Sequence, residues 1–295
     1  NITGTAPEFL QFDLRNKEKV FEIFYLHPDI EGIIHFAASK AVGESVSDPL
    51  SYYENNLGSL IHLLQVVEKN KKTCSFIFSS SCTVYGQADT LPIGEEAPIK
   101  QAASPYGNTK QVGENILKDN THSNPLLRVI SLRYFNPIGS HPSNEIGELP
   151  KGKPQNLVPF ITQTGAGLHK QLMVFGDDYP TPDGSCIRDY IHVVDLAKAH
   201  VVGLERMLNQ KQKENFEVFN LGTGKGNSVF EVINTFEKIS GIALKYEIAA
   251  RRAGDIVSAY ADTTKANHEL GWKAENNLEE ALKTAWAWEK KIRNL

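Results

Sequence analysis

Short apolar runs alternate with longer amphipathic segments through the first half of the chain. Residues 32–37, 75–79 and 127–134 are rich in β-branched, aromatic and leucine side chains, which is typical of buried strands. Residues 50–68 and 106–119 carry apolar side chains at helical spacing, which predicts helices. This alternation of strands and helices predicts an α/β fold whose parallel sheet is covered on both faces.

The character of the chain changes after Pro137. Residues 139–156 are rich in Gly, Pro, Ser and Asn, which indicates a loop that crosses between domains. The later pattern predicts further helices and strands: helices over 157–168, 193–208, 229–239 and from Leu278, and strands near 172–175 and 216–221. We therefore expect residues 1–137 to form a doubly wound, Rossmann-like sheet. Residues 138–295 form a smaller mixed domain, with about 189–225 returning to the main sheet.

Composition excludes several classes of function. The formal charge is −4 and no basic run occurs, which argues against a nucleic-acid partner. No apolar run approaches the roughly 20 residues that a membrane span needs. The three cysteines, Cys74, Cys82 and Cys186, are widely separated and form no C-x-x-C pair, so neither a zinc site nor a disulfide framework is predicted. A reducing cytosol fits this cysteine content best.

The spacing of Tyr106 and Lys110 indicates acid–base chemistry. Residues four apart lie on one face of a helix. A free tyrosine has a pKa of about 10, and a nearby ammonium group favours the phenolate, so we expect Lys110 to lower the pKa of Tyr106 toward neutrality. The alternative for this pair alone is an exposed helix face.

Serines 79–81 follow a buried strand by one step, at the strand's carboxyl end. A turn or a helix N-cap would explain them too. Taken together with Tyr106 and Lys110, the order Ser…Tyr-x-x-x-Lys resembles the triad of short-chain dehydrogenases/reductases.

A closer resemblance extends from about Asp13 to the end of the chain. Five stretches resemble UDP-galactose (UDP-glucose) 4-epimerases of the extended short-chain dehydrogenase/reductase family, in the same order and with similar spacing: residues 35–45, 79–86, 132–139, 188–193 and 251–255. The resemblance implies an isomerase that interconverts UDP-glucose and UDP-galactose through a 4-keto intermediate and bound NAD. It also implies a cytoplasmic homodimer built from helices near 50–69 and 105–119.

The same resemblance implies three catalytic roles. Tyr106 is the base that removes the proton from the sugar O4, and Ser81 relays a hydrogen bond. Lys110 lowers the pKa of Tyr106 and holds the nicotinamide ribose. One feature of the family is missing, because its first strand, its Gly-x-x-Gly-x-x-Gly turn and the acidic residue after its second strand do not occur. We therefore expect a polypeptide starting at Asn1 to bind NAD poorly.

NAD-binding positions follow from the resemblance. Asp13 and Leu14 match a pair that contacts adenine, although a turn would also explain Asp13. The alternatives are a solvated charge for Lys40, a buried amide cap for Asn56 and core packing for Tyr134. The implied set is Asp13, Leu14, Phe36, Ala37, Ala38, Lys40, Asn56, Ser79, Tyr106, Lys110 and Tyr134.

UDP-sugar positions are also implied. Arg188 and Arg252 match a pair that clamps the diphosphate, a role that suits guanidinium groups; surface salt bridges are the alternative. Phe175 matches a residue beside uracil, or is a strand-core aromatic, and Asn156 is equally a helix N-cap. The implied set is Ser81, Tyr106, Asn136, Asn156, Leu157, Phe175, Arg188, Tyr190, Arg252, Asp255 and Ala259.

Ala259 bears on substrate range. In the family, a bulky aromatic at this position accompanies restriction to UDP-glucose and UDP-galactose, and a small residue accompanies acceptance of N-acetyl sugars. The alanine therefore predicts that UDP-GlcNAc and UDP-GalNAc are interconverted as well. The alternative is a small core residue with the gap filled by another side chain.

Two rival functions remain. A nucleotide-sugar 4,6-dehydratase needs an acid and a base after the active-site hydroxyl residue, where this chain has Cys82 and Thr83. A non-catalytic NAD-binding scaffold would typically lose Tyr106 or Lys110. No metal is expected, because no other metal-ligating residues accompany His35 or His192 at a suitable spacing.

Overall fold

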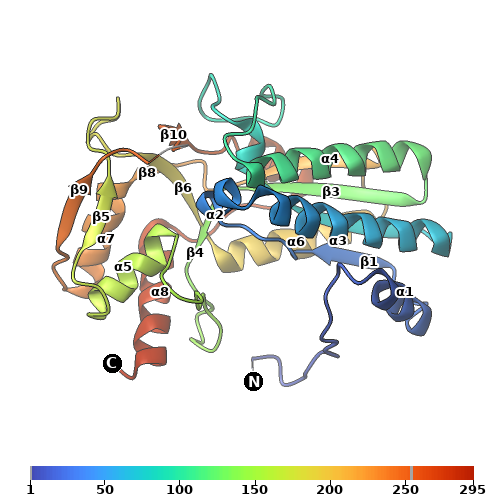
Figure 1. Ribbon diagram of the computed structural model, residues 1–295, viewed down its shortest axis with the longest axis horizontal. Helices are drawn as coiled ribbons and strands as arrows, with labels where there is room; N and C mark the ends of the chain where they lie inside the picture. Colours follow the sequence, from blue (N-terminus) through green and yellow to red (C-terminus); the bar gives the residue numbers. More distant parts are fainter. Residues whose placement is uncertain (1, 253–254) are drawn as a thin grey trace.

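A four-stranded parallel sheet forms the centre of the larger half of the molecule (Figure 1). In the computed structural model, which describes residues 2–252 and 255–295, the strand order is β1–β2–β3–β7. The strands are β1 (Gly32–His35), β2 (Cys74–Ser81), β3 (Leu127–Tyr134) and β7 (Phe216–Leu221). Ser81 lies opposite Tyr134, and Tyr134 opposite Leu221, so three strands end at one edge. The predicted α/β class is confirmed.

Both faces of this sheet are covered by helices. Alternate side chains of β2 divide between two apolar clusters: Phe76 and Phe78 pack with one, and Ile77 packs with the other. The first cluster includes residues of α1 (Lys17–Leu26), α3 (Pro49–Asn70) and α4 (Pro105–Ser123), and the second includes residues of α6 (Val193–Leu208). Burial on both faces explains why these strands are continuous apolar runs.

The smaller half has its own core. Its helices α5 (Leu157–Gly165), α7 (Val229–Ser240) and α8 (Leu278–Arg293) lie beside the parallel pair β5 (Leu172–Phe175) and β9 (Tyr246–Ala249) (Figure 1). Phe236 of α7 meets Trp286 of α8 edge to face, with ring centres 5.4 Å apart. Such aromatic pairs add to the stabilisation from apolar burial.

A second sheet lies between the two halves (Figure 1). Its order is β10–β6–β4, with β8 antiparallel to β6. The strands are β4 (Asn136–Ile138), β6 (Ile187–His192), β8 (Gly226–Ser228) and β10 (Ser258–Ala259).

The sequence pattern did not predict the shorter elements: α1, α2 (Val42–Ser47), β4, β6, β8, β9, β10, and the short helical turns η1 (Cys82–Tyr85) and η2 (Ala266–Leu270). Most of them have too few residues to show a period, and β6 carries charged side chains within the strand. Over residues 2–252 and 255–295, no helix has the length and apolar character to cross a membrane.

Candidate functional site

Helix α4 carries Tyr106 and Lys110 beside the end of β2. The hydroxyl of Ser104 accepts a hydrogen bond from Gly107 N at 3.2 Å and caps the helix, and Pro105 occupies its first turn. One turn further on, Lys110 Nζ donates to the carbonyl oxygen of Ser79 at 2.7 Å. The same nitrogen lies 5.9 Å from the centre of the Tyr106 ring. The strand end and the helix therefore place Tyr106 and Lys110 together.

Ser81, at the last position of β2, is buried. Its hydroxyl accepts from Thr83 N at 3.2 Å and caps η1, so the N-cap interpretation of this serine is correct. The hydroxyl also acts on Tyr106, where its hydrogen bond lowers the phenol pKa. A cap and a contact to the phenol are compatible in one side chain, because a hydroxyl both accepts and donates.

Burial dominates the titration of this group. It lowers the pKa of Lys110 to about 8, and the charge of Glu114 opposes that fall. Burial raises the pKa of Tyr106 well above its ordinary value, and the hydrogen bond from Ser81 offsets only part of the rise. On balance the pKa of Tyr106 is therefore raised in this structure, and the effect of Lys110 on it stays a prediction.

His200 of α6 was missed by the sequence analysis. Its ring centre lies 4.6 Å from that of Phe36 and 6.1 Å from that of Tyr134, and Nε2 lies 3.4 Å from Ser79 Oγ. Three of the positions predicted to bind NAD thus meet around one histidine. A single histidine inside an amphipathic helix gives no signal, and only the packing of α6 on the sheet reveals it.

Asn56 holds the loop after β1. Its amide accepts from Ser39 N at 2.8 Å and donates to Ser39 O and Thr109 Oγ1, both at 3.0 Å. The amide is engaged by protein groups, which agrees with the buried-cap alternative. Asn56 therefore fixes the loop of Ala37 and Ala38 against α4.

Lys40 and Asn156 come together although they were assigned to different ligands. Lys40 Nζ lies 3.5 Å from Glu148 Oε1, and Asn156 Nδ2 donates to the same oxygen at 3.3 Å. Asn156 occupies the N-cap position of α5 but makes no side-chain cap bond, and Leu157 begins the helix. Glu148 is thus a bridge between the two predicted surfaces.

Asp13 and Leu14 lie in the turn before α1. The Asp13 carboxylate pairs with Arg15 at 2.7 Å, which lowers its pKa to about 2, and it also accepts from Arg15 N. The Leu14 carbonyl oxygen lies 3.1 Å from His62 Nδ1. These contacts match the turn alternative for Asp13.

The predicted diphosphate clamp converges on one carboxylate. Asp255 Oδ1 accepts from Arg252 Nη2 at 2.9 Å and lies 4.0 Å from Arg188 Nη2. The guanidinium carbon of Arg252 lies 5.4 Å from the centre of the Phe175 ring, at the end of β5. The Ala253–Gly254 step of this motif lies outside the described residues. The structure therefore gathers the two arginines, Phe175 and Asp255.

The sheet between the two halves places the remaining substrate positions. Asn136 of β4 lies opposite Tyr190 of β6, and Ala259 of β10 lies opposite Arg188. Tyr190 is buried in the core of the smaller half, and burial raises the pKa of its phenol. Ala259 is buried in an apolar cluster, as the small-core alternative expects.

This arrangement defines a class of protein. A doubly wound sheet with Ser, Tyr and Lys at its strand ends, next to a smaller half with paired arginines, is an enzyme of the extended short-chain dehydrogenase/reductase type. A family profile described as GDP-mannose 4,6 dehydratase matches residues 2–285. A UDP-glucose 4-epimerase of Bacillus subtilis is 49% identical over 290 residues, covering 98% of this chain and 83% of that protein.

Solved structures agree with these relatives. The UDP-glucose 4-epimerase of Bifidobacterium longum in complex with NAD+ and UDP is 46% identical with a TM-score of 0.93, covering 99% of this chain and 86% of that one. The UDP-Glc/GlcNAc 4-epimerase of Campylobacter jejuni is 36% identical with a TM-score of 0.82, covering 98% and 86%. The chain belongs to the extended short-chain dehydrogenase/reductase family and, within it, to the UDP-glucose 4-epimerases.

Proposed function

We propose that the protein interconverts UDP-glucose and UDP-galactose by 4-epimerisation with bound NAD. The observation that carries this proposal is the grouping of Ser81, Tyr106 and Lys110 at the end of β2. When bound, NAD+ would accept the hydride from the sugar C4 and would add a positive charge to the site. Tyr106 removes the proton from O4 and later returns it, while Lys110 and Ser81 stabilise its ionised form.

The chain's own residues fit a dinucleotide. At the end of β1 the side chain of Ala37 is small and exposed, so a ligand can approach the backbone there. Phe36, Tyr134 and Ser79 meet around His200 and form an aromatic and polar wall next to Lys110. We propose that residues 1–137 hold NAD and residues 138–295 hold the UDP-sugar, with Arg188 and Arg252 on the diphosphate.

The family profile carries the name of a dehydratase, and Cys82 argues against that reaction here. Dehydration needs acid–base groups after the active-site hydroxyl. Burial raises the pKa of the Cys82 thiol to about 11, so it stays protonated and is a poor acid near neutral pH. Epimerisation needs only one base, which Tyr106 supplies.

Three finer points are also proposed. Ala259 leaves room for N-acetyl sugars. Two copies pair through α3 and α4, and Leu50 and Ile61 of α3 expose apolar side chains for this contact. Sedimentation as a monomer at micromolar concentration would exclude this. The cytoplasm is the proposed location, and fractionation of cells tests it.

Replacement of Tyr106 by Phe tests the mechanism. We expect turnover of UDP-galactose by the holoenzyme to fall at least 10²-fold, the scale for loss of a positioned base, with UDP affinity retained. Tyr53→Phe is the matched control. Tyr53 OH accepts a hydrogen bond at 2.6 Å from Asn108, which lies on α4 with Tyr106, but Tyr53 is not the proposed base. Equal turnover in both variants would reject Tyr106 as the base.

A further inference from the structure

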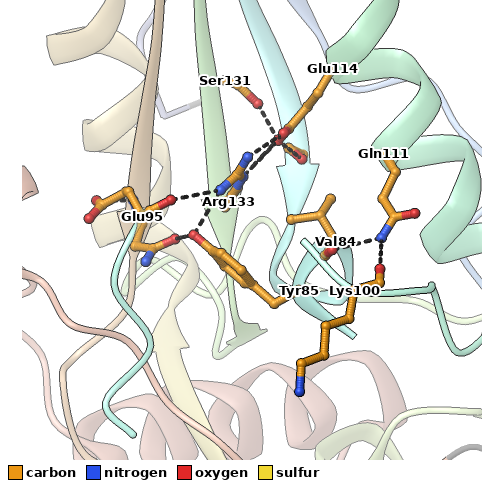
Figure 2. Close-up of polar contacts among 10 residues, drawn as sticks. Val84, Tyr85, Glu95, Lys100, Gln111, Glu114, Ser131 and Arg133 are labelled. Atoms are coloured by element: carbon orange, nitrogen blue, oxygen red, sulfur yellow. Dashed lines mark hydrogen bonds and ion pairs between the residues drawn. The ribbon is translucent and has the colours of Figure 1, made fainter. Parts of the chain in front are cut away.

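The carboxylate of Glu114 is buried one helical turn beyond Lys110. It accepts hydrogen bonds from Ser80 Oγ at 2.6 Å and Ser131 Oγ at 2.8 Å, one donor from each of two neighbouring strands. Arg133 adds three more, from Nε to the two carboxylate oxygens at 2.9 Å and 3.2 Å and from Nη2 at 2.5 Å (Figure 2). A buried ion pair is weak evidence of a stabilising role, because desolvation offsets its attraction. Another reason for its presence is therefore needed.

Arg133 is itself fixed by further contacts. Its Nη1 donates to Tyr85 OH at 3.0 Å, and Tyr85 OH donates to Asn220 Oδ1 at 2.7 Å (Figure 2). One turn earlier on α4, Gln111 Nε2 donates to the carbonyl oxygens of Val84 and Lys100 (Figure 2). The carboxylate of Glu114 is thus held directly by groups from β2 and β3, and groups from η1 and β7 hold its partner Arg133 in place. Its position relative to α4 is rigid.

Lys110 needs a nearby anion because its ammonium group is buried. Within residues 2–252 and 255–295, Lys110 makes no ion pair within 4.0 Å, and its ammonium group donates to the neutral carbonyl of Ser79. Lys110 and Glu114 lie one turn apart on α4 and bind consecutive residues of β2, Ser79 and Ser80. Glu114 is therefore the anion placed to compensate the ammonium.

The other titratable groups near α4 do not supply that anion. Burial lowers the pKa of His35, at the end of β1, to about 4, so it is neutral at pH 7. Burial raises the pKa of the phenols and the thiol, which keeps them neutral as well. The groups from the packed elements are Glu44 of α2, Tyr52 of α3, Cys82 and Tyr85 of η1, and Arg133 and Tyr134 of β3. Glu44 is also a carboxylate, but it lies on α2 and accepts from Tyr52 OH at 2.7 Å, whereas Glu114 lies one turn from Lys110 on the same helix.

We propose that Glu114 is a positioning residue for the reaction, whose carboxylate, held by Arg133, keeps Lys110 positively charged beside Tyr106. This inference rests on the proposed 4-epimerase function, in which the ammonium stabilises the phenolate. Burial lowers the pKa of Lys110 and Glu114 raises it, as the geometry requires.

The pH dependence of kcat for UDP-galactose tests the proposal in the holoenzyme. Glu114→Gln keeps the shape but removes the negative charge and leaves Arg133 uncompensated, and both changes lower the pKa of Lys110. Lys110 then loses its proton at a lower pH, so the alkaline limb of the profile should move down by about one pH unit. Arg133→Gln removes the cation that keeps the buried carboxylate of Glu114 ionised and in place, so the limb should move down in this variant as well.

Glu217→Gln is the matched control. Glu217 pairs with Arg206 at 2.7 Å, and their side chains are only 7% and 10% exposed, a burial similar to that of Glu114 and Arg133. It lies at the start of β7, away from the carboxyl edge of the sheet. This variant should lower stability to urea without moving the limb.

The outcomes separate the two proposals. An inactive wild-type holoenzyme rejects the 4-epimerase function itself. The role of Glu114 is overturned if the wild type is active and its alkaline limb lies at the same pH as in all three variants, Glu114→Gln, Arg133→Gln and Glu217→Gln. If Glu114→Gln does not fold, Arg133→Gln decides alone: a downward shift supports the role, because loss of a cation by itself would raise the limb, and an unchanged or raised limb rejects it.

Discussion

Two adjacent arginines have different partners. Arg251 Nε pairs with Asp178 at 2.7 Å, and its guanidinium carbon lies 4.2 Å from the centre of the Tyr179 ring. Arg252 instead contacts Asp255 and stands over Phe175. The side chain of Arg252 is 55% exposed, so it is free to turn toward a ligand at little cost. Neighbours in sequence thus provide a test and its control.

Arg252→Ala should weaken UDP-sugar binding by about 1.5–3 kcal/mol, the range for hydrogen bonds to charged groups. Arg251→Ala should leave the affinity nearly unchanged, because Arg251 is engaged by Asp178. Calorimetric titration of UDP into both variants measures the difference. Equal losses in the two variants would show that this segment contributes only general positive charge.

At the scale of the element, α3 and α4 each contain a glycine, and the two glycines differ in how closely other side chains pack against them. A Cβ added at Gly113 of α4 would lie 2.8 Å from Phe78 Cζ and 3.5 Å from Leu60 Cδ2. A Cβ at Gly58 of α3 would meet nothing within 4 Å. Phe78 is buried and its ring lies 5.0 Å from Lys110 Nζ. Gly113 therefore permits the close packing of α4 that brings Lys110 to β2.

Gly113→Ala should lower the free energy of unfolding by about 1–3 kcal/mol, because the added methyl overpacks the core. Gly58→Ala should raise it by up to about 1 kcal/mol, because alanine is the better helix former at an open position. Urea unfolding of both variants provides the measurement. Stabilisation of both would mean that Phe78 moves aside without cost.

At the scale of the whole molecule, the sheet between the halves brings both sets of predicted residues together. Arg188 of β6 lies opposite Ala259 of β10. Ala259 packs in a cluster with Val84 and Tyr85 of η1, which follows Ser81. If Ala259 limits substrate range as proposed, that limit is set where the two halves meet.

The enzyme should use UDP-GlcNAc and UDP-GalNAc as well as the plain sugars. Ala259→Tyr fills the space, so we expect kcat/KM for the N-acetyl pair to fall by about 10-fold or more, the equivalent of 1–3 kcal/mol of overpacking. The plain pair should change little. Ser258→Tyr is the control, because successive strand residues point to opposite faces. A wild-type preference above about 10³-fold for plain sugars, unchanged in Ala259→Tyr, would contradict the assignment.

The sequence by itself determined the long elements. Strand β3 has the predicted bounds, and α3, α4 and α6 lie within a few residues of theirs, because a run of many residues repeats its apolar period several times. The motif around Tyr106 was visible for a related reason, since a spacing of four on a helix is a local property. The family resemblance then supplied the activity.

Only the tertiary structure decided how the site is charged. The pKa of Tyr106 rises because elements far apart in the chain bury it, and no local spacing reveals burial. Glu114 stands four residues after Lys110, but its partner Arg133 comes from another strand. His200 of α6 meets Phe36, which follows β1, and Asp255, which precedes β10, lies near Arg188 of β6. These contacts depend on packing between segments that are far apart in the chain, and such packing leaves no local pattern in the sequence.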